Sequence, residues 1–335
     1  MTLKDSLLWP FTLTYGAVSR LRARTYRAGI LRQRRLEGVV ISVGNLTTGG
    51  TGKTPMVLWI AQRLLAEGKR AAILTRGYRG ETSPAGRTSD EAQLLRSRLG
   101  EAVALGVGAD RFARGEELAT RGIGWFILDD GFQHLQLARD VDVVLIDATN
   151  PFGGGRLLPA GRLREPKSAL ARADILVITR SDRAPALEAS LRHDSSAPIF
   201  YARTHLESIR AVRGDSPGAE DPDAHSRKYF AFCGIGNPGA FLSDLRAWGL
   251  DIVGHKSFPD HHRYTPQDAR EIENEARVAG ASALLCTEKD IFNLAGVRME
   301  SFSVSCCRIS LRIDRDEEFW RLILSIAGSR AKSPR

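Results

Sequence analysis

The sequence lacks the long apolar run that a membrane-spanning helix requires. An apolar stretch at residues 7–18 is interrupted by Pro10 and Gly16, whereas a spanning helix needs roughly 20 apolar residues. No positive segment precedes this stretch and no small-residue cleavage site follows it, so it does not resemble a secretory signal. We therefore expect neither a transmembrane nor a secreted protein.

Cysteine is scarce as well, with four residues in a chain of 335. None stands in a C-x-x-C pair or near histidines at metal-binding spacing, and the adjacent Cys306 and Cys307 cannot easily bridge to each other. This argues against a disulfide framework or a structural metal site and predicts a reducing, cytosolic compartment. A chain of this length, with no internal repeat, predicts two domains that each bury their own core.

Basic charge is concentrated at one end of the chain, whose formal net charge is +9. Residues 1–35 hold eight lysines and arginines against the single acid Asp5, so the remainder is nearly neutral. A nucleic-acid-binding protein would more often spread basic residues over its folded body. We therefore expect no nucleic-acid partner.

This basic block overlaps the apolar stretch, a combination typical of a helix that lies in a membrane interface. Trp9, Phe11 and Tyr15 would sit at headgroup depth, and the arginines would contact anionic lipid phosphates. The alternative is an ordinary N-terminal helix that packs on the protein and leaves its arginines in water. We favour membrane contact through residues 1–35.

From Gly38 onward, short apolar runs alternate with helix-like segments. Expected strands cover residues 39–43, 71–74, 125–128, 143–146 and 175–178, and residues 55–67 predict a helix. These strands are apolar on both faces and are separated by helices. They therefore predict an α/β fold with a parallel sheet covered by helices on both faces.

A phosphate-binding loop follows the first strand. Residues 47–54 match the pattern G-x-x-x-x-G-K-[ST], except that Thr47 replaces the first glycine. Exposed N–H groups, Lys53 and the helix N-terminus would bind phosphates, and the Thr54 hydroxyl would serve Mg²⁺. The motif predicts a P-loop NTPase-type domain that binds ATP. Its expected nucleotide-binding residues are Thr47, Thr48, Gly49, Gly50, Thr51, Gly52, Lys53 and Thr54.

Asp129 and Asp130 end the strand at residues 125–128, where a P-loop protein needs an acid to organise its metal ion. One would serve Mg²⁺ and the other would orient it, although either would also cap the turn before Gly131. Asp147, after a later strand, is a competing candidate.

A segment rich in Ser, Pro, Gly and Asp at residues 195–222 marks the expected domain boundary. A smaller α/β domain would follow, with strands at 229–232, 283–286 and 302–304 and a closing helix at 319–326. We expect four parts, namely an interfacial segment at 1–35, a P-loop domain at 36–198, a smaller domain at 199–327 and a disordered tail at 328–335.

Residues 129–134, Asp-Asp-Gly-Phe-Gln-His, begin a series of more specific motifs. The others are Ser-Val-Gly-Asn-Leu at 42–46, Thr-Arg-Gly-Tyr at 75–78, Leu-Pro-Ala-Gly-Arg-Leu-Arg-Glu-Pro at 158–166, Phe-Cys-Gly-Ile-Gly-Asn-Pro at 232–238 and Thr-Glu-Lys-Asp at 287–290. With these motifs, in this order over nearly the whole chain, the sequence closely resembles the tetraacyldisaccharide 4′-kinase family.

The resemblance implies transfer of the γ-phosphoryl group of ATP to the 4′-hydroxyl of an acylated glucosamine disaccharide 1-phosphate. This step of lipid A biosynthesis in Gram-negative bacteria gives lipid IVA. Because that lipid lies in the inner leaflet of the cytoplasmic membrane, the family implies a peripheral enzyme on the cytoplasmic face, attached through residues 1–35. It also implies that Thr47 does not weaken ATP binding. We expect a monomer.

The family places its catalytic base in a Ser/Gly-Asp-Glu motif, matched by Asp90, and assists it with the histidine of an Asp-His pair, matched by His261. From the residues alone, Asp90 would also serve as the N-cap of a helix at 92–99, and His262 rivals His261. A histidine in the second domain acting on an aspartate in the first would require the domains to close on substrate. The expected catalytic residues are Asp90, His261, Lys53 and Asp130.

Arg162, Arg164 and Glu165 follow a second glycine-rich stretch. An arginine fork suits a phosphate group, so we expect this loop to bind the 1-phosphate of the substrate. The alternative is a solvated surface loop.

Two further motifs carry less weight. Residues 234–239 fit G-x-G-x-x-G, but Pro238 removes a backbone N–H, and no acid stands on a clear second strand about 20 residues on, so we favour a tight strand-to-helix turn. Residues 179–182 and 287–290 resemble the base-reading motif of GTPases and are candidate nucleotide or domain contacts. The rival functions are a nucleotide-gated membrane switch, which would hydrolyse ATP without a lipid acceptor, and a dinucleotide oxidoreductase.

Overall fold

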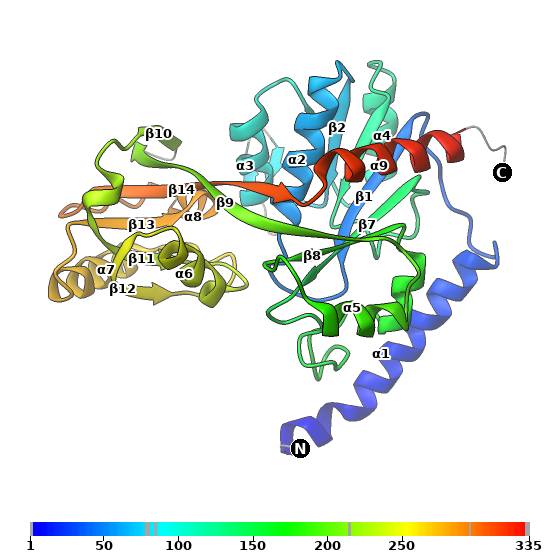
Figure 1. Cartoon of the computed structure of the whole chain (residues 1–335), viewed down its shortest axis with the longest axis horizontal. Helices are drawn as coiled ribbons and strands as arrows, with labels where there is room; N and C mark the ends of the chain where they lie inside the picture. Colours follow the sequence, from blue (N-terminus) through cyan, green and yellow to red (C-terminus); the bar gives the residue numbers. More distant parts are fainter. Residues whose placement is uncertain (1–2, 78–80, 84–85, 214–215, 295, 332–335) are drawn as a thin grey trace. The chain divides into compact units, whose positions relative to one another are not determined.

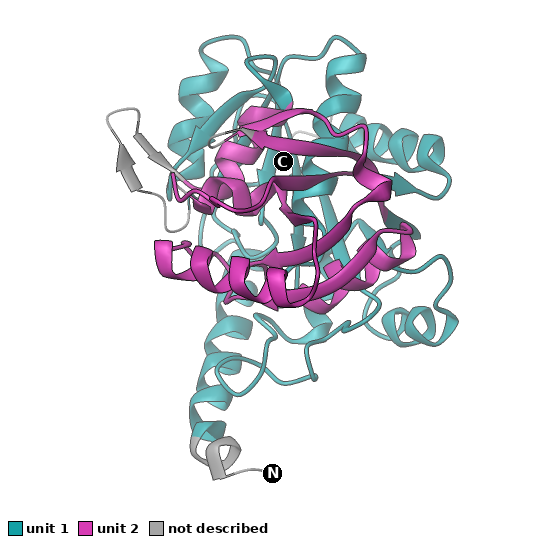
Figure 2. Cartoon of the chain, turned by 90° about the vertical axis from the view of Figure 1, so that its left-hand side faces the viewer, with its two compact units in different colours: residues 1–77, 99–203, 311–335 teal, residues 78–98, 204–310 magenta. Residues whose placement is uncertain are grey.

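The computed structural model describes residues 3–77, 81–83, 86–213, 216–294 and 296–331 (Figure 1). The chain forms two compact units. Unit 1 comprises Met1–Gly77, Leu99–Arg203 and Leu311–Arg335, and unit 2 comprises Tyr78–Arg98 and Thr204–Ser310 (Figure 2). Both units are α/β, which confirms the predicted fold class.

The sheet of unit 1 has the strand order β9-β8-β7-β1-β6-β2-β5, with parallel pairing throughout. Its strands are β1 (Val39–Asn45), β2 (Ala71–Thr75), β5 (Ala104–Val107), β6 (Trp125–Asp129), β7 (Val141–Asp147), β8 (Ile175–Thr179) and the beginning of β9 (Ile199–Arg213). Its helices are α1 (Leu3–Arg27), α2 (Lys53–Ala66), α4 (Arg111–Ala119), η1 (Lys167–Arg172), α5 (Pro185–Arg192) and α9 (Asp316–Ala331).

Helices cover both faces of this sheet (Figure 1). On one face, Val144 and Ile146 of β7 belong to a buried cluster that includes Leu170 of η1 and Leu191 of α5. Helices α2 and α9 pack together, with the rings of Trp59 and Phe319 5.4 Å apart. Apolar side chains on both strand faces therefore have partners, as the continuous apolar runs predict.

Parallel pairing places the carboxyl ends of neighbouring strands at one edge of the sheet. Strand β1 pairs with β6 in a register that sets Val43 opposite Asp129. The segment after β1 and the segment after β6 consequently lie beside each other. At this edge the phosphate-binding loop meets the Asp129-Asp130 motif.

Helix α1 packs on unit 1 along one face. The Tyr15 hydroxyl donates a hydrogen bond to the Arg164 carbonyl (2.9 Å), and the Ala160 N–H donates to Thr12 (3.3 Å). Trp9 and Phe11 are exposed. Among the described residues, no helix is both long enough and apolar enough to span a bilayer.

Unit 2 contains a second parallel sheet segment, β12-β11-β13-β14, beside β9. Tyr229 and Ala231 of β11 pack in the cluster that holds α6, whereas Phe230 and Phe232 pack in the cluster that holds α7 and α8. Its elements are β3 (Glu81–Ser83), β4 (Gly86–Thr88), α3 (Asp90–Leu99), β10 (Ser216–Glu220), η2 (Ala224–Ser226), β11 (Lys228–Cys233), α6 (Pro238–Ala247), β12 (Asp251–Ser257), α7 (Pro266–Val278), β13 (Ala283–Thr287), α8 (Glu288–Leu294) and β14 (Val304–Ile313).

The division into units differs from the sequence-based boundaries of 36–198 and 199–327. Strands β9 and β14 each run from one unit into the other, so the chain returns to unit 1 at Leu311 and α9 belongs there. Residues 78–98 belong to unit 2. The expected tail at 328–335 is corrected in part, because α9 extends to Ala331; residues 332–335 lie outside the described part of the chain, as does Tyr78 of the 75–78 motif.

The close contact between Gly44 and the fully buried Phe132 gives a stability test. A Cβ at Gly44 would lie 2.6 Å from the Phe132 Cβ and 2.7 Å from its backbone nitrogen. Because the backbone atom cannot easily move, we expect Gly44→Ala to lower the free energy of unfolding by roughly 1–3 kcal/mol in urea titrations. In the control Gly124→Ala, the new Cβ meets nothing within 4 Å, and a change below about 0.5 kcal/mol is expected. Equal stability of the two variants would contradict this packing.

Candidate active site

The phosphate-binding loop of unit 1 connects β1 to α2 through two glycines in unusual backbone conformations. Gly49 has φ 126° and Gly52 has φ 89°, values that only glycine adopts without strain. Gly52 precedes Lys53, the first residue of α2, so the free N–H groups of the helix start border the loop. The Thr179 hydroxyl donates to the Thr51 carbonyl (3.2 Å) and so holds the loop backbone.

Four side chains form what we call the P-loop cluster: Asn45, Lys53, Asp130 and Arg164. The Lys53 ammonium lies 3.2 Å from the Asn45 amide oxygen and 3.6 Å from Asp130. The two terminal nitrogens of Arg164 donate to the two Asp130 oxygens at 2.7 and 2.8 Å, and one also contacts Asn45. Burial alone would raise the pKa of Asp130, but Lys53 and Arg164 hold it well below its usual range. Asp130 is therefore ionised and accepts hydrogen bonds only.

Asp129 is the buried last residue of β6, and it accepts a hydrogen bond from the Thr75 hydroxyl (3.3 Å). Thr54, the second residue of α2, supplies a hydroxyl at the loop. Hydroxyl and carboxylate oxygens are the donors that Mg²⁺ prefers. The residues of this sheet edge therefore fit a magnesium ion.

The loop that carries Arg162, Arg164 and Glu165 lies against the phosphate-binding loop. The Thr48 N–H donates to the Arg162 carbonyl (2.8 Å), and the Arg164 N–H donates to Leu46 (2.7 Å). The Arg162 side chain is exposed. Glu165 is buried and pairs with Arg172 at 2.9 Å, so its carboxylate is already neutralised within the fold.

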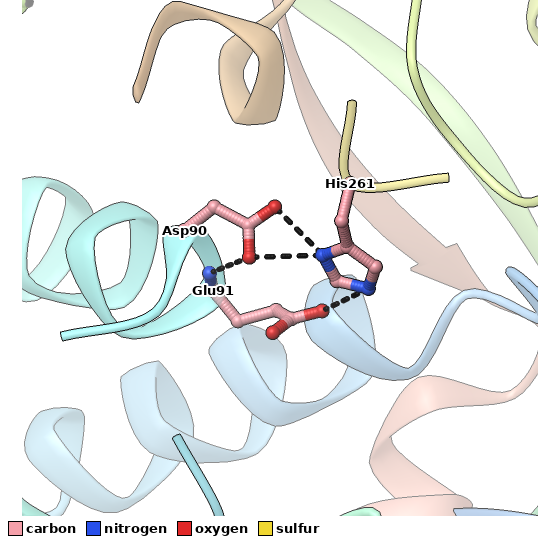
Figure 3. Close-up of side chains that lie close together, drawn as sticks. All are labelled: Asp90, Glu91 and His261. Atoms are coloured by element: carbon pink, nitrogen blue, oxygen red, sulfur yellow. Dashed lines mark hydrogen bonds and ion pairs between the residues drawn. The ribbon is translucent and has the colours of Figure 1, made fainter. Parts of the chain in front are cut away.

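In unit 2, a second group of side chains surrounds a buried carboxylate. We call it the Asp90 cluster: Asp90, Glu91, Asp260, His261, Lys289 and Asn293. Nδ1 of His261 lies 2.9 Å from one Asp90 oxygen and 3.2 Å from the other (Figure 3). The Asn293 amide donates to Asp90 (3.1 Å). Oδ1 of Asp90 also accepts a hydrogen bond from the Glu91 N–H (3.0 Å).

The cap of α3 is Ser89, because its hydroxyl accepts a hydrogen bond from the Ala92 N–H (3.3 Å). Asp90 is the first residue of the helix. Capping therefore does not explain the position of this aspartate, whose side chain is turned toward His261 (Figure 3).

The two tandem histidines have different partners. His261 has φ 60°, and its N–H donates to the Gly234 carbonyl at 3.0 Å. This left-handed turn directs its ring to Asp90, whereas His262 binds Asp268 (3.1 Å) and stacks on Phe258. The structure thus places His261, and not His262, beside Asp90.

The charges and hydrogen bonds of the Asp90 cluster shift the pKa values of its members in different directions. Burial would raise the pKa of Asp90, but the hydrogen bond from His261 and the charge of Lys289 lower it to about 2. The hydrogen bond to Asp90 raises the pKa of His261, against burial and the charge of Lys289. For Glu91, burial raises the pKa. Because an ionised Asp90 is only an acceptor, Nδ1 of His261 carries a proton.

Comparison with known proteins identifies the family. The family model for tetraacyldisaccharide-1-P 4′-kinase matches residues 4–327. A tetraacyldisaccharide 4′-kinase of Pelobacter propionicus is 41% identical over 313 residues, which cover 88% of this chain and 84% of the relative. One of Desulfotalea psychrophila is 37% identical over 350 residues, with 97% of each chain covered. The chain belongs to the tetraacyldisaccharide 4′-kinase family.

A solved structure agrees with this assignment. LpxK from Aquifex aeolicus, in its "apo" form in complex with ATP, superposes with a TM-score of 0.72 at 31% identity, covering 97% of this chain and 99% of that one. The protein is therefore a kinase of lipid A biosynthesis that phosphorylates the lipid A precursor.

Sequence reasoning missed three polar side chains of the kinase. Asn45 ends β1 inside a motif that was noted without a role, and it contacts both cations of the P-loop cluster. Lys289 and Asn293 lie four residues apart on α8 and both contact Asp90. The Thr-Glu-Lys-Asp motif at 287–290, which contains Lys289, was the sequence feature that could have indicated this region.

The structure also shows where the remaining sequence motifs of the kinase lie. Residues 234–239 form a turn from β11 into α6, capped by Asn237, as favoured from the sequence. In the 287–290 motif, the buried Asp290 accepts hydrogen bonds from the Gly234 N–H (2.7 Å) and the Tyr264 hydroxyl (2.8 Å). Asp147, the rival metal ligand, pairs with Arg180 at 3.2 Å.

The Asp90–His261 contact gives a spectroscopic test. Because the Asp90 carboxylate stabilises the imidazolium, we expect Asp90→Asn to lower the pKa of His261 in an NMR titration of the ring protons. The control Asp251→Asn, at an exposed position of β12 in the same unit, should leave the pKa of His261 unchanged. An unchanged His261 titration in Asp90→Asn would exclude the contact in solution.

Proposed function

We propose that Asp90 is the catalytic base of this kinase, and that the reaction moves the γ-phosphoryl group of ATP to the 4′-hydroxyl of a tetraacylated glucosamine disaccharide 1-phosphate. The observation that carries the proposal is a buried, ionised carboxylate aligned by His261 and Asn293. Phosphoryl transfer requires mainly positioning and charge neutralisation, together with a group that accepts the proton of the hydroxyl.

The donor half of the reaction belongs to the P-loop cluster. When ATP binds, the Lys53 ammonium would move from Asp130 to the β and γ phosphates. The phosphates would also accept hydrogen bonds from the N–H groups at the start of α2. Thr54, Asp129 and Asp130 would hold Mg²⁺, which when bound neutralises charge on the phosphates. Arg164 would keep Asp130 ionised and oriented, as it does through its paired hydrogen bonds.

The acceptor half belongs to the Asp90 cluster. The proton of the 4′-hydroxyl moves to Asp90 as the hydroxyl oxygen forms a bond to the γ-phosphorus. The bond from the γ-phosphorus to the bridging oxygen breaks, and ADP keeps its electron pair. When Nε2 of His261 is protonated as well as Nδ1, the resulting imidazolium lowers the pKa of the Asp90 carboxylate and weakens it as a base. Loss of the Nε2 proton therefore makes Asp90 the better acceptor.

Substrate recognition would involve the loop at residues 162–165. Arg162 is exposed and adjoins the phosphate-binding loop, so we propose that it contacts the 1-phosphate of the lipid. Arg164 and Glu165 already have partners inside unit 1. Their part in binding would be to fix the backbone that presents Arg162.

Membrane contact would involve α1. One face of this helix packs on unit 1, while apolar and basic side chains remain exposed. Among the side chains described from residue 8 onward, the exposed large apolar residues of α1 are Trp9, Phe11, Leu13, Val18 and Leu21, and Ile30 and Leu31 follow the helix. We propose that they enter the interface on the cytoplasmic face of the inner membrane, and that the protein acts there as a monomer.

The catalytic assignment is tested with the tetraacylated disaccharide 1-phosphate and Mg-ATP. Mass spectrometry should show one added phosphate with the unaltered protein. Asp90→Asn should lower kcat by roughly 10²–10⁴-fold, since a general base contributes about that much, and should leave ATP binding unchanged. Full activity in Asp90→Asn would remove this residue as the base. ATP hydrolysis with no lipid consumed would favour the membrane switch.

The membrane proposal is tested by vesicle flotation with anionic lipids. Replacing both Trp9 and Phe11 by Ser removes exposed apolar area that would enter the interface, so binding should fall by at least about tenfold. Val278→Ser provides the control, because Val278 is 91% exposed in unit 2. Equal binding by both variants would argue against an interfacial role for α1.

A further inference from the structure

Lys289 stands among charges that the reaction described so far does not use. Its ammonium lies 3.3 Å from Asp260, 3.4 Å from Glu91 and 3.6 Å from Asp90. It also lies 3.4 Å from Nε2 of His261, the ring nitrogen opposite the one that faces Asp90. The side chain is only 19% exposed. A lysine held among three carboxylates and a histidine is an unusual arrangement, because lysines ordinarily extend into water.

The fold fixes the backbone on both sides of this lysine. Its neighbour Asp290 is fully buried and joins Thr287, Gly234 and Tyr264 by hydrogen bonds. The other neighbour, Glu288, pairs with the buried Arg98 at 2.9 Å. The backbone that carries Lys289 is therefore held in place from both sides.

Helix α8 directs two side chains to the same carboxylate. Lys289 and Asn293 are four residues apart, so they share one helix face, and both contact Asp90 through its Oδ2 atom. One brings a charge and the other a neutral hydrogen bond. The helix thus serves as a support for the Asp90–His261 pair.

We propose that Lys289 is a positioning residue of the phosphotransfer reaction, whose ammonium sets the charge state of His261 and thereby the readiness of Asp90 to accept a proton. This inference rests on the proposed role of Asp90. Within the described part of the chain, the charged groups recorded near His261 include Asp90 and Glu91 from α3, Asp260 from its own loop and Lys289 from α8. Of these four, the three carboxylates favour an imidazolium when ionised, and the Lys289 ammonium opposes it.

The direction of the effect follows from these charges. Lys289 disfavours the imidazolium, so His261 becomes neutral at a lower pH than it would beside the carboxylates alone. Neutral His261 leaves Asp90 the stronger base. Lys289 also lowers the pKa of Asp90 itself, which would weaken the base at every pH. Its removal should therefore shift the pH dependence without reducing the maximum rate.

The test compares Lys289→Met with the unaltered full-length protein. In Lys289→Met, the acid limb of the kcat–pH profile should move to higher pH by about one unit, so that kcat is about tenfold lower on that limb and equal or higher at alkaline pH. KM for ATP should not change. The NMR titration of His261 should move in the same direction, and Lys289→Arg should restore both. A uniform loss of kcat at all pH values, or an unmoved limb, would overturn the inference.

A second variant keeps the test decisive if Lys289→Met folds poorly. Asp260→Asn removes a partly exposed carboxylate 3.8 Å from His261, so the limb and the His261 titration should both move to lower pH. No shift in Asp260→Asn would count against electrostatic control of His261. If Asp90→Asn retains full activity, the base assignment fails; if Asp90→Asn is inactive and Lys289→Met shows no shift, the role of Lys289 alone fails.

Discussion

The parallel pairing of β1 with β6 is the constraint on which the P-loop cluster depends. It sets the ends of the two strands side by side, with Val43 opposite Asp129. The absence of a side chain at Gly44 lets Phe132 pack against β1 at the point where the strand gives way to the loop. Asp130 then reaches Lys53 at the start of α2. A shift of the register would separate the Asp130 carboxylate from the Lys53 ammonium and break this partly exposed ion pair.

In unit 2, the segments around the Asp90 cluster are held together by a buried acid, Asp290, and not by the register of two strands. Asp290 lies at the start of α8 and joins three segments through Gly234, Tyr264 and Thr287. The turn after β11, the loop that contains His261 and helix α8 are thereby held together. An unpaired buried carboxylate would be costly, but here Oδ1 of Asp290 accepts from Gly234 and Tyr264, and Oδ2 accepts from Thr287. The hydrogen bonds of Asp290 therefore help to align His261 with Asp90.

Continuous apolar runs were sufficient to predict the central strands, because these strands are buried on both faces. The loop that follows β1 was predicted from its G-x-x-x-x-G-K-[ST] pattern. It could not predict that β9 continues to Arg213 or that β14 runs from Val304 to Ile313, since long parts of both strands are polar and half-exposed. Nor does a linear pattern show that the chain returns to unit 1. Family motifs located Asp90 and His261, but the placement of Lys289 depends on how α8 is packed. The buried pair of Glu165 with Arg172 was also beyond prediction, because charged loop residues usually remain in water.

The two central carboxylates, Asp130 and Asp90, are both ionised, but their partners suit them to different tasks. Asp130 faces Lys53 and Arg164, and the guanidinium does not lose its charge at any pH at which the protein is folded. A carboxylate held in this way is a poor proton acceptor, and it stays ionised, as a metal ligand must. Asp90 faces His261, a side chain that can gain or lose a proton and whose pKa is raised by its hydrogen bond to Asp90. Its basicity therefore varies with the state of one neighbour, which is the property that a proton acceptor needs and a metal ligand does not.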